Sequence, residues 1–195
     1  LPKLLGKMYN DRVYYKKKML EAKKEYNKTK EPKLQNEIAR CHNIQWAKKI
    51  ALNSAYGAIG NQYFRYYDVR QAMAITLAGQ FVIRFIEKNV NEYMNKILKT
   101  HDKIDYVVAS DTDSIYLTMD KLVEQVCKDK TKDQTLKFLN KVVESRIEPF
   151  LDKCFKQLAE YTNAFENKMV MKREVIADKG IWTAKKRYML NVLDE

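Results

Sequence analysis

The sequence predicts an α+β protein, in which an antiparallel hairpin of helices is attached to an antiparallel sheet with packed helices. Three observations lead to this prediction. Apolar residues recur at helical spacing from Leu4 to Tyr56, and short runs rich in Val, Ile and Tyr flank the segment Asp111 to Ser114. Helical and extended patterns then follow one another without a regular β-α-β alternation, which is typical of the α+β class.

In the first part of the chain we expect two helices joined by a short basic turn. The first pattern covers residues 4–27, Pro32 interrupts it, and the second runs from Leu34 to Tyr56. The two helices should lie antiparallel. Gly57 and Gly60 are expected to break the second helix. The aromatic residues of 61–68 are expected to pack and to anchor the hairpin to the following domain.

The rest of the chain predicts two helices and four strands. The helices are expected at residues 70–98, with one apolar stripe interpreted as core, and at 135–161, with a bend at Pro149. Two of the strands form a β-hairpin with acidic residues near its tip, and the other two surround Asp178, Lys179 and Gly180. The four predicted strands are residues 105–110, 115–119, 169–177 and 187–192.

The charge of the chain favours a polyanionic partner. Its 37 Lys and Arg residues exceed its 25 Asp and Glu residues, which gives a net charge of +12. Such a surplus suits nucleic acid or a membrane surface. Residues 1–50 hold 14 basic and 5 acidic residues, so nine of the twelve surplus charges lie in the predicted hairpin. The alternative is an ordinary solvated charged face.

The ends and the cysteines of the chain support three further expectations. There is no apolar run of about 18 residues and no signal-peptide pattern, so we expect a soluble intracellular protein. A helical pattern is already present shortly after Leu1, which indicates a segment of a longer protein. The three cysteines lie far apart, so neither a disulfide framework nor a zinc site is expected.

Asp111 and Asp113 are the candidate metal ligands. They stand two residues apart, so their carboxylates converge on one small volume whether the backbone is extended or forms a tight turn. Carboxylate oxygens are ligands that suit Mg²⁺. The alternative is that these aspartates only form a turn, but the apolar runs on both sides favour a strand pair with a function. Glu174 is a candidate third acid near the metals, or else a partner for Arg173 or Lys172.

Two basic clusters are candidate binding sites. On the second helix Lys49, Asn53 and Tyr56 share one face, where Lys suits a phosphate and the other two suit a base and sugar. Arg12 and Lys16, four residues apart on the first helix, offer a second phosphate grip. For each lysine taken alone, the alternative is an ordinary solvated side chain.

The second cluster is Lys185 to Tyr188, in which three cations precede an aromatic ring at the start of a predicted strand. Such a segment suits contact with a nucleic-acid backbone, and its alternative is ordinary surface charge.

These motifs resemble those of family B DNA polymerases. K-I-A-L-N-S-A-Y-G at Lys49 to Gly57 is similar to motif B of that family, and D-T-D-S at Asp111 to Ser114 is similar to motif C. K-K-R-Y at Lys185 to Tyr188 resembles the downstream DNA-binding motif. Motif B continues through F-R-Y-Y-D at Phe64 to Asp68 and A-I-T at Ala74 to Thr76, which is most similar to replicative polymerases of tailed bacteriophages.

The resemblance implies a DNA-directed DNA polymerase that uses two Mg²⁺ ions to add nucleotides to a primer 3′-hydroxyl. It implies a fingers hairpin at residues 1–57 and a partial palm domain at 58–195. Asp113 would be the main metal ligand of motif C, with Asp111 beside it. The implied dNTP-binding residues are Arg12, Lys16, Lys49, Asn53 and Tyr56. The implied primer-template contacts are Gly57, Ser114, Lys185, Lys186, Arg187 and Tyr188.

The sequence also departs from the family pattern. Ala109 and Ser110 stand where Tyr-Gly is usual, and motif A, which carries the other essential Asp, is absent, as are the exonuclease and the thumb. We therefore expect an incomplete and inactive fragment. The resemblance implies a sliding clamp, bound through a missing C-terminal part, and, for a phage protein, the host cytoplasm.

Two other classes of function stay open at this point. One is a non-catalytic nucleic-acid-binding module, in which the acids merely end a strand and binding depends on salt but not on Mg²⁺. The other is a structural or assembly subunit, which would pair through a sheet edge left open by the absent motif A strand.

Overall fold

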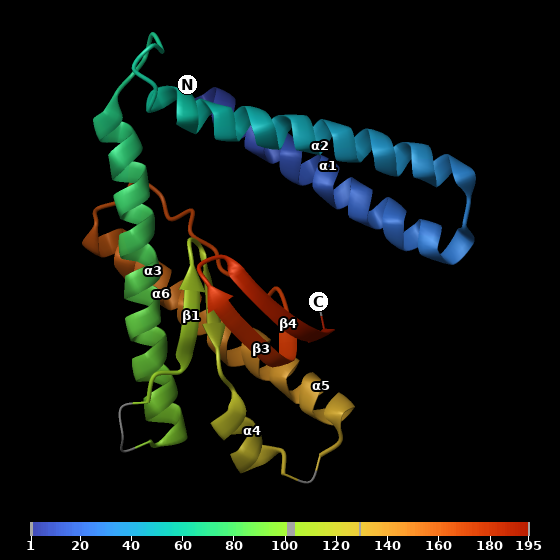
Figure 1. Ribbon diagram of the computed structural model, residues 1–195, viewed down its shortest axis with the longest axis vertical. Coiled ribbons are helices and arrows are strands. Elements are labelled where there is room, and N and C mark those ends of the chain that lie inside the picture. The colour runs from blue at the N-terminus through green and yellow to red at the C-terminus, as the bar shows by residue number, and fades with distance from the viewer. Residues whose placement is uncertain (1, 101–103, 129, 195) are drawn as a thin grey trace. The chain divides into compact units, whose positions relative to one another are not determined.

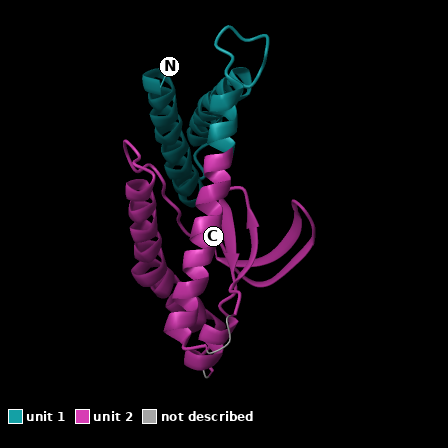
Figure 2. Ribbon diagram, turned by 90° about the vertical axis from the view of Figure 1, so that its left-hand side faces the viewer, with its two compact units in different colours: residues 1–76 teal, residues 77–195 magenta. Residues whose placement is uncertain are grey.

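The computed structural model describes residues 2–100, 104–128 and 130–194 (Figure 1). It divides into two compact units, Leu1–Thr76 and Leu77–Glu195, with the boundary inside a long helix (Figure 2). Helices and two small antiparallel sheets confirm the predicted α+β class. The finer division into fingers at 1–57 and palm at 58–195 stays a prediction. None of the described helices is both long enough and apolar enough to cross a membrane.

The first unit contains the predicted helical hairpin, formed by α1 (Pro2–Thr29) and α2 (Pro32–Ile59). Pro32 begins α2 because the first position of a helix needs no backbone N–H partner. Lys30, with φ of 58°, reverses the chain between the helices. The buried seam is narrow and consists of Met19 and Ala22 of α1 and of Cys41, Gln45 and Ile59 of α2.

Polar contacts fix the antiparallel register of the hairpin. The Lys18 ammonium lies 2.8 Å from the Glu37 carboxylate, and the Lys48 ammonium lies 2.8 Å from the Asp11 carboxylate. Near the turn, the Gln35 amide donates to the Tyr26 hydroxyl. In these three contacts the residue number of the α2 partner falls as the residue number of the α1 partner rises. The two helices therefore run in opposite directions (Figure 1).

Two expectations about the end of this hairpin are wrong. Gly57 does not break α2, which continues to Ile59 and is capped by Gly60. A single glycine inside a helix costs only about 1 kcal/mol relative to Ala, less than the neighbouring turns supply. The aromatic residues of 61–68 do not form a buried anchor, since Tyr63 is 88% exposed and Tyr66, which contacts Phe64 edge to face, is 67% exposed. The loop closes instead through its own backbone hydrogen bonds.

The long helix α3 (Val69–Leu98) carries the core of the second unit on its C-terminal half. Ile86, Val90, Met94 and Leu98 recur every four residues and are all buried. The residues packed with them are Tyr106, Val107, Ile147, Leu151, Cys154 and Phe155. The prediction that the whole apolar stripe is core is wrong for its N-terminal half, where Ile75 is 54% exposed.

The predicted acidic hairpin is formed by β1 (Val107–Asp111) and β2 (Ser114–Leu117). Two asparagines of α3 hold the chain that leads into it. The Asn91 side-chain oxygen accepts from the backbone N–H of Tyr106 at 2.8 Å and of Val107 at 3.1 Å. The Asn95 side-chain amide donates to the Ile104 carbonyl at 2.7 Å. These bonds satisfy backbone groups that have no strand partner.

The predicted helix at 135–161 is interrupted as expected. It consists of α5 (Lys132–Val142), a π-helical segment (Val143–Ile147) and α6 (Glu148–Tyr161). Pro149 explains the irregular segment, because in a regular α-helix its ring would clash with the carbonyl of Ser145. The helix begins at Lys132 and not at the predicted residue 135, because Thr131 and Gln134 form a capping box. A further short helix, α4 (Asp120–Val126), was not predicted.

The last two strands differ from the prediction. They are β3 (Ile176–Ala184) and β4 (Arg187–Asp194), so the predicted strand at 169–177 is wrong and the turn lies at Lys185 and Lys186 instead of 178–180. Gly180 is a strand residue, and a Cβ there would lie only 2.6 Å from the Trp182 ring. β3 pairs with β4 alone, so the structure has two separate two-stranded sheets where we expected one sheet.

We predict that Ile86→Ala lowers the free energy of unfolding by about 2–5 kcal/mol, because the side chain is fully buried and its removal leaves a cavity. Ile97→Ala on the same helix is the control, since Ile97 is 47% exposed. It should change stability by less than about 1 kcal/mol. Urea unfolding followed by circular dichroism measures both, and equal effects would contradict the assignment of the core.

Candidate functional site

Both candidate metal ligands lie at the tip of the β1–β2 hairpin. Asp111 ends β1 and pairs with Ser114, the first residue of β2. Thr112 has φ of 56°, and the Asp113 N–H donates to the Asp111 carbonyl at 2.7 Å, so the chain reverses within two residues. The Ser114 hydroxyl donates to the same carbonyl at 3.1 Å. The structure thus confirms the predicted acidic hairpin tip.

The Asp111 carboxylate forms an ion pair with Lys186. The lysine ammonium lies 3.2 Å from Oδ1 and 3.3 Å from Oδ2, and the Thr112 hydroxyl donates to Oδ1 at 3.0 Å. The Lys186 ammonium, assisted by the Thr112 hydroxyl, holds the pKa of Asp111 below its usual value. Asp111 is therefore ionised at neutral pH and already neutralised by a cation of the chain.

Aromatic rings hold the two sheets together next to this ion pair. The Tyr116 ring of β2 meets the Trp182 ring at 5.3 Å and the Tyr188 ring at 5.4 Å, both edge to face. Burial, followed by the side-chain interaction with Tyr188, raises the pKa of the Tyr116 hydroxyl. Lys186 lies in the β3–β4 turn with φ of 62°. The predicted DNA-binding segment therefore lies beside the carboxylates.

Asp113 and Glu174 differ from Asp111 in their surroundings. Within residues 2–100, 104–128 and 130–194, the Asp113 carboxylate takes part in no ion pair, which leaves its oxygens available. Glu174 is exposed, in the irregular segment before β3. Its neighbour Arg173 pairs with Asp194 at 3.1 Å. Among the described residues no group of three or more acids, histidines or cysteines is arranged to bind a metal, and the role of Glu174 stays a prediction.

The donor set at the tip suits a hard divalent cation only in part. Two carboxylates two residues apart supply the oxygen ligands that Mg²⁺ prefers, while such ions usually complete their shell with water and substrate phosphate. Because Lys186 already neutralises Asp111, Asp113 is the better candidate ligand. These residues therefore fit Mg²⁺ as part of a larger ligand set.

The predicted nucleotide-binding residues lie on the helical hairpin. Arg12 and Lys16 are one turn apart on α1, while Lys49, Asn53 and Tyr56 follow one another on α2. The Arg12 Nε is buried and has no hydrogen-bond partner in the described chain. The Tyr56 hydroxyl lies 2.7 Å from the Thr76 hydroxyl. This contact holds the ring against the start of α3.

One ion pair connects the two helices at the level of these residues. Asp11 precedes Arg12, Lys48 precedes Lys49, and the two charges lie 2.8 Å apart. The Lys48 ammonium lowers the pKa of Asp11. Sequence reasoning missed this pair, as it missed the asparagines of α3 and the Trp182 contact. Opposite charges 37 positions apart give no local sequence signal.

An acidic hairpin tip paired with a cationic turn suits binding of a metal ion and of phosphate groups together. Comparison with known proteins identifies the family. Residues 1–194 match the sequence profile of DNA polymerase family B. The chain is 44% identical to the DNA-directed DNA polymerase of Enterobacteria phage T4 over 160 residues, which cover 77% of this chain and 18% of the relative.

A second relative agrees. The chain is 45% identical to the DNA-directed DNA polymerase of Escherichia phage RB69 over 157 residues, which cover 75% of this chain and 17% of that protein. The chain therefore belongs to DNA polymerase family B. It spans less than a fifth of the length of these two relatives.

The ion pair predicts the titration of Asp111. In metal-free solution its pKa should lie below the usual value, and Lys186→Met should raise it toward that value. Because the folded-state pKa is depressed, the pair stabilises the fold above the ordinary pKa of about 3.9. This stabilisation is lost as the pH falls through the lowered pKa. Carboxyl-detected NMR measures both variants.

Lys185→Met is the matched control for this titration, because Lys185 acts on Asp111 only as a more distant charge. It removes the same charge from the same turn and should shift the Asp111 pKa less than Lys186→Met does. An equal shift in the two variants would mean that general charge, and not the observed ion pair, sets the pKa.

Proposed function

We propose that this chain supplies part of the polymerase site of a DNA-directed DNA polymerase, which adds deoxynucleotides to a primer 3′-hydroxyl and releases pyrophosphate. The observation that carries the proposal is the acidic tip of Asp111 and Asp113 beside the Lys186 turn. It occurs in a chain that matches family B over residues 1–194. The two phage relatives, which carry this activity in their names, support it.

Asp113 would bind Mg²⁺, with Asp111 beside it and Glu174 as a candidate further acid. When bound, two such ions activate the attacking oxygen and stabilise the leaving oxygen. Lys186 lowers the pKa of Asp111 and holds this carboxylate in its ionised form, while Asp113, which has no ion-pair partner among the described residues, supplies the free negative charge at the tip. The chain spans less than a fifth of the length of its two phage relatives, which supports the proposal that these 195 residues alone do not polymerise.

The basic hairpin would bind the incoming nucleotide. Arg12, Lys16 and Lys49 suit the triphosphate, and the unpartnered Arg12 Nε supports this role. Asn53 and Tyr56 would contact the sugar and base. The hydrogen bond to Thr76 would fix the Tyr56 ring, which is 44% exposed.

The primer-template would be contacted at the other motifs. Lys185, Lys186 and Arg187 suit the phosphate backbone, and Tyr188 packs on Tyr116 to fix their turn. Gly57 and Ser114 are further candidate contacts. The names of the phage relatives support the cytoplasm of the host cell as the location. A sliding clamp, bound through another part of the parent enzyme, is the proposed further partner.

A chimeric enzyme tests the proposal. The 160 aligned residues of the T4 phage relative are replaced by those of this chain, and primer extension is measured with Mg²⁺ and four dNTPs. The chimera should extend the primer, and Asp113→Asn should reduce the rate by at least about 100-fold, since even groups behind metal ligands contribute 10- to 100-fold.

Asp152→Asn is the control for this substitution, because Asp152 is exposed on α6 away from the hairpin tip. It should leave primer extension within about 2-fold of the unsubstituted chimera, as expected for an ordinary surface residue. An active chimera that tolerates Asp113→Asn would overturn the assignment of the metal site.

The nucleotide role is tested in the same chimera with Lys16→Ala. Loss of a triphosphate contact should raise the KM for dNTP by about 10-fold or more, because charge-assisted hydrogen bonds to phosphate are strong. Lys17→Ala removes the same charge from the next position, where Lys17 only pairs weakly with Glu21 at 3.9 Å. Equal KM values for the two variants would argue against Lys16 as a specific contact.

A further inference from the structure

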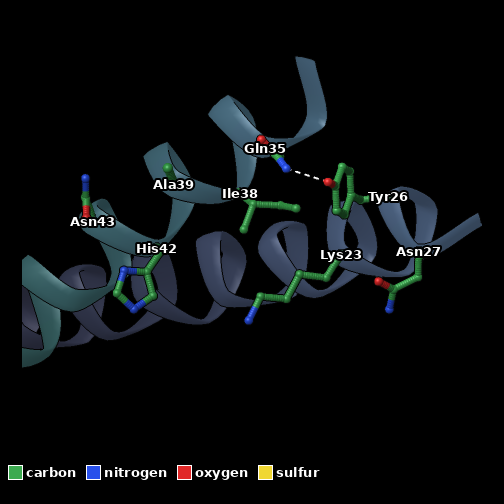
Figure 3. A pocket seen from close by; sticks show the side chains of 8 residues that line it. All are labelled: Lys23, Tyr26, Asn27, Gln35, Ile38, Ala39, His42 and Asn43. Carbon is green, nitrogen blue, oxygen red and sulfur yellow. Dashed lines mark hydrogen bonds between the residues drawn. The ribbon is translucent and has the colours of Figure 1, made fainter. Parts of the chain in front are cut away.

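A groove lies between α1 and α2 in the half of the hairpin nearest its turn (Figure 3). Its volume is about 500 Å³, within the range of small-molecule sites. The residues that line this hairpin groove are Lys23, Tyr26 and Asn27 of α1 and Gln35, Ile38, Ala39, His42 and Asn43 of α2. None of them belongs to the polymerase motifs described above.

The groove combines aromatic rings with polar groups of both kinds. Tyr26 and Gln35 meet across it, and the Lys23 side chain extends along α1 toward His42 (Figure 3). The Lys30 ammonium lies 5.4 Å from the centre of the Tyr26 ring. Side-chain amides, which both donate and accept hydrogen bonds, come from α1 and from α2.

The same chemistry continues along α2 beyond the groove. The rings of His42 and Trp46 are stacked, with centres 6.2 Å apart and planes 11° apart. Trp46 is nevertheless 49% exposed, and the Lys49 ammonium lies 5.2 Å from its ring centre. A stripe of α2 with alternating spacings of four and three residues connects the groove to the proposed nucleotide contacts. Its members are Gln35, Ala39, His42, Trp46, Lys49 and Asn53.

We propose that the hairpin groove and this stripe bind single-stranded DNA. Exposed rings next to lysines are the chemistry that binds unpaired bases, which stack on the rings while cations contact the phosphates. Residues 1–50 carry nine surplus positive charges, which complements a polyanion. The groove shares no residue with the polymerase motifs, and the stripe meets the proposed nucleotide contacts only at Lys49 and Asn53, so the proposal goes beyond the polymerase chemistry and requires no Mg²⁺.

The dimensions and chemistry favour a strand over other ligands. From Gln35 to Asn53 the stripe is about 27 Å long at 1.5 Å per residue, which is too long for one nucleotide and suits several. Duplex DNA keeps its base faces stacked inside, so it could use the cations but not the half-buried Tyr26 ring or the exposed Trp46 ring. An acidic peptide would likewise leave the rings without a stacking partner.

Fluorescence of Trp46 tests the proposal directly. The chain has two tryptophans, so Trp182→Phe leaves Trp46 as the single indole reporter. A dT12 oligonucleotide is added to this 195-residue variant at low salt with EDTA. We expect saturable quenching of Trp46, reversed by added salt. Anisotropy of labelled dT12 and of a 12-base-pair duplex should show at least about 5-fold tighter binding of the single strand.

Substitutions with matched controls then locate the site. In the native sequence Tyr26→Ala should weaken binding of dT12 by about 5- to 100-fold, the range for loss of one base stack. Tyr14→Ala is its control, since Tyr14 is 61% exposed and lies about 120° around α1 from Tyr26. Lys23→Ala should weaken binding more than Lys28→Ala, which removes the same charge about 140° away. Circular dichroism checks that each variant keeps its helices.

Three results would overturn the proposal. Equal affinity for single strand and duplex without Trp46 quenching would show binding by charge alone. Quenching by dTTP at concentrations as low as those of dT12 would show a site for one nucleotide. Equal effects of Tyr26→Ala and Tyr14→Ala would place the strand elsewhere. None of these results bears on Asp113, so the polymerase assignment is tested separately.

Discussion

The position of the acidic hairpin depends on two asparagine side chains of α3. Asn91 accepts from the backbone of Tyr106 and Val107, and Asn95 donates to the backbone of Ile104, immediately before β1. A two-stranded sheet is marginal by itself, because each strand has an unpaired edge. The asparagines tie the segment that leads into β1 to α3, and the buried Tyr106 fixes the same segment in the core.

From this anchored strand the rest of the site is built by contacts between side chains. Tyr116 joins β2 to Trp182 and Tyr188 of the second sheet, and Lys186 then reaches Asp111. Gly180 belongs to the same arrangement, because the Trp182 ring occupies the space that a Cβ would need. The sheets share no backbone ladder, so these rings and the ion pair contribute to how the cationic turn meets the acidic tip, together with the Asn140–Asp194 contact that ties β4 to α5.

Much of the fold follows from local sequence patterns, while its long-range contacts do not. The helical hairpin, α3 and the acidic tip were predicted because periodicity and apolar flanks are local signals. The strand predicted at 169–177 was wrong because Val170 and Met171 look extended without a partner to pair with. The turn was misplaced because Gly180 was interpreted as a turn residue, when its small size serves the Trp182 ring. The Lys186–Asp111 pair joins positions that only the fold brings together.

The Lys186–Asp111 ion pair has a thermodynamic consequence for the two kinds of ligand proposed for this site. A phosphate that takes the Lys186 ammonium must first separate it from Asp111, and this leaves an uncompensated carboxylate that attracts a cation. By reciprocity, a cation that neutralises Asp111 releases the lysine for a phosphate. In the proposed polymerase site each ligand would therefore raise the affinity for the other, so that the proposed phosphate and metal contacts would be coupled through a single pair of side chains.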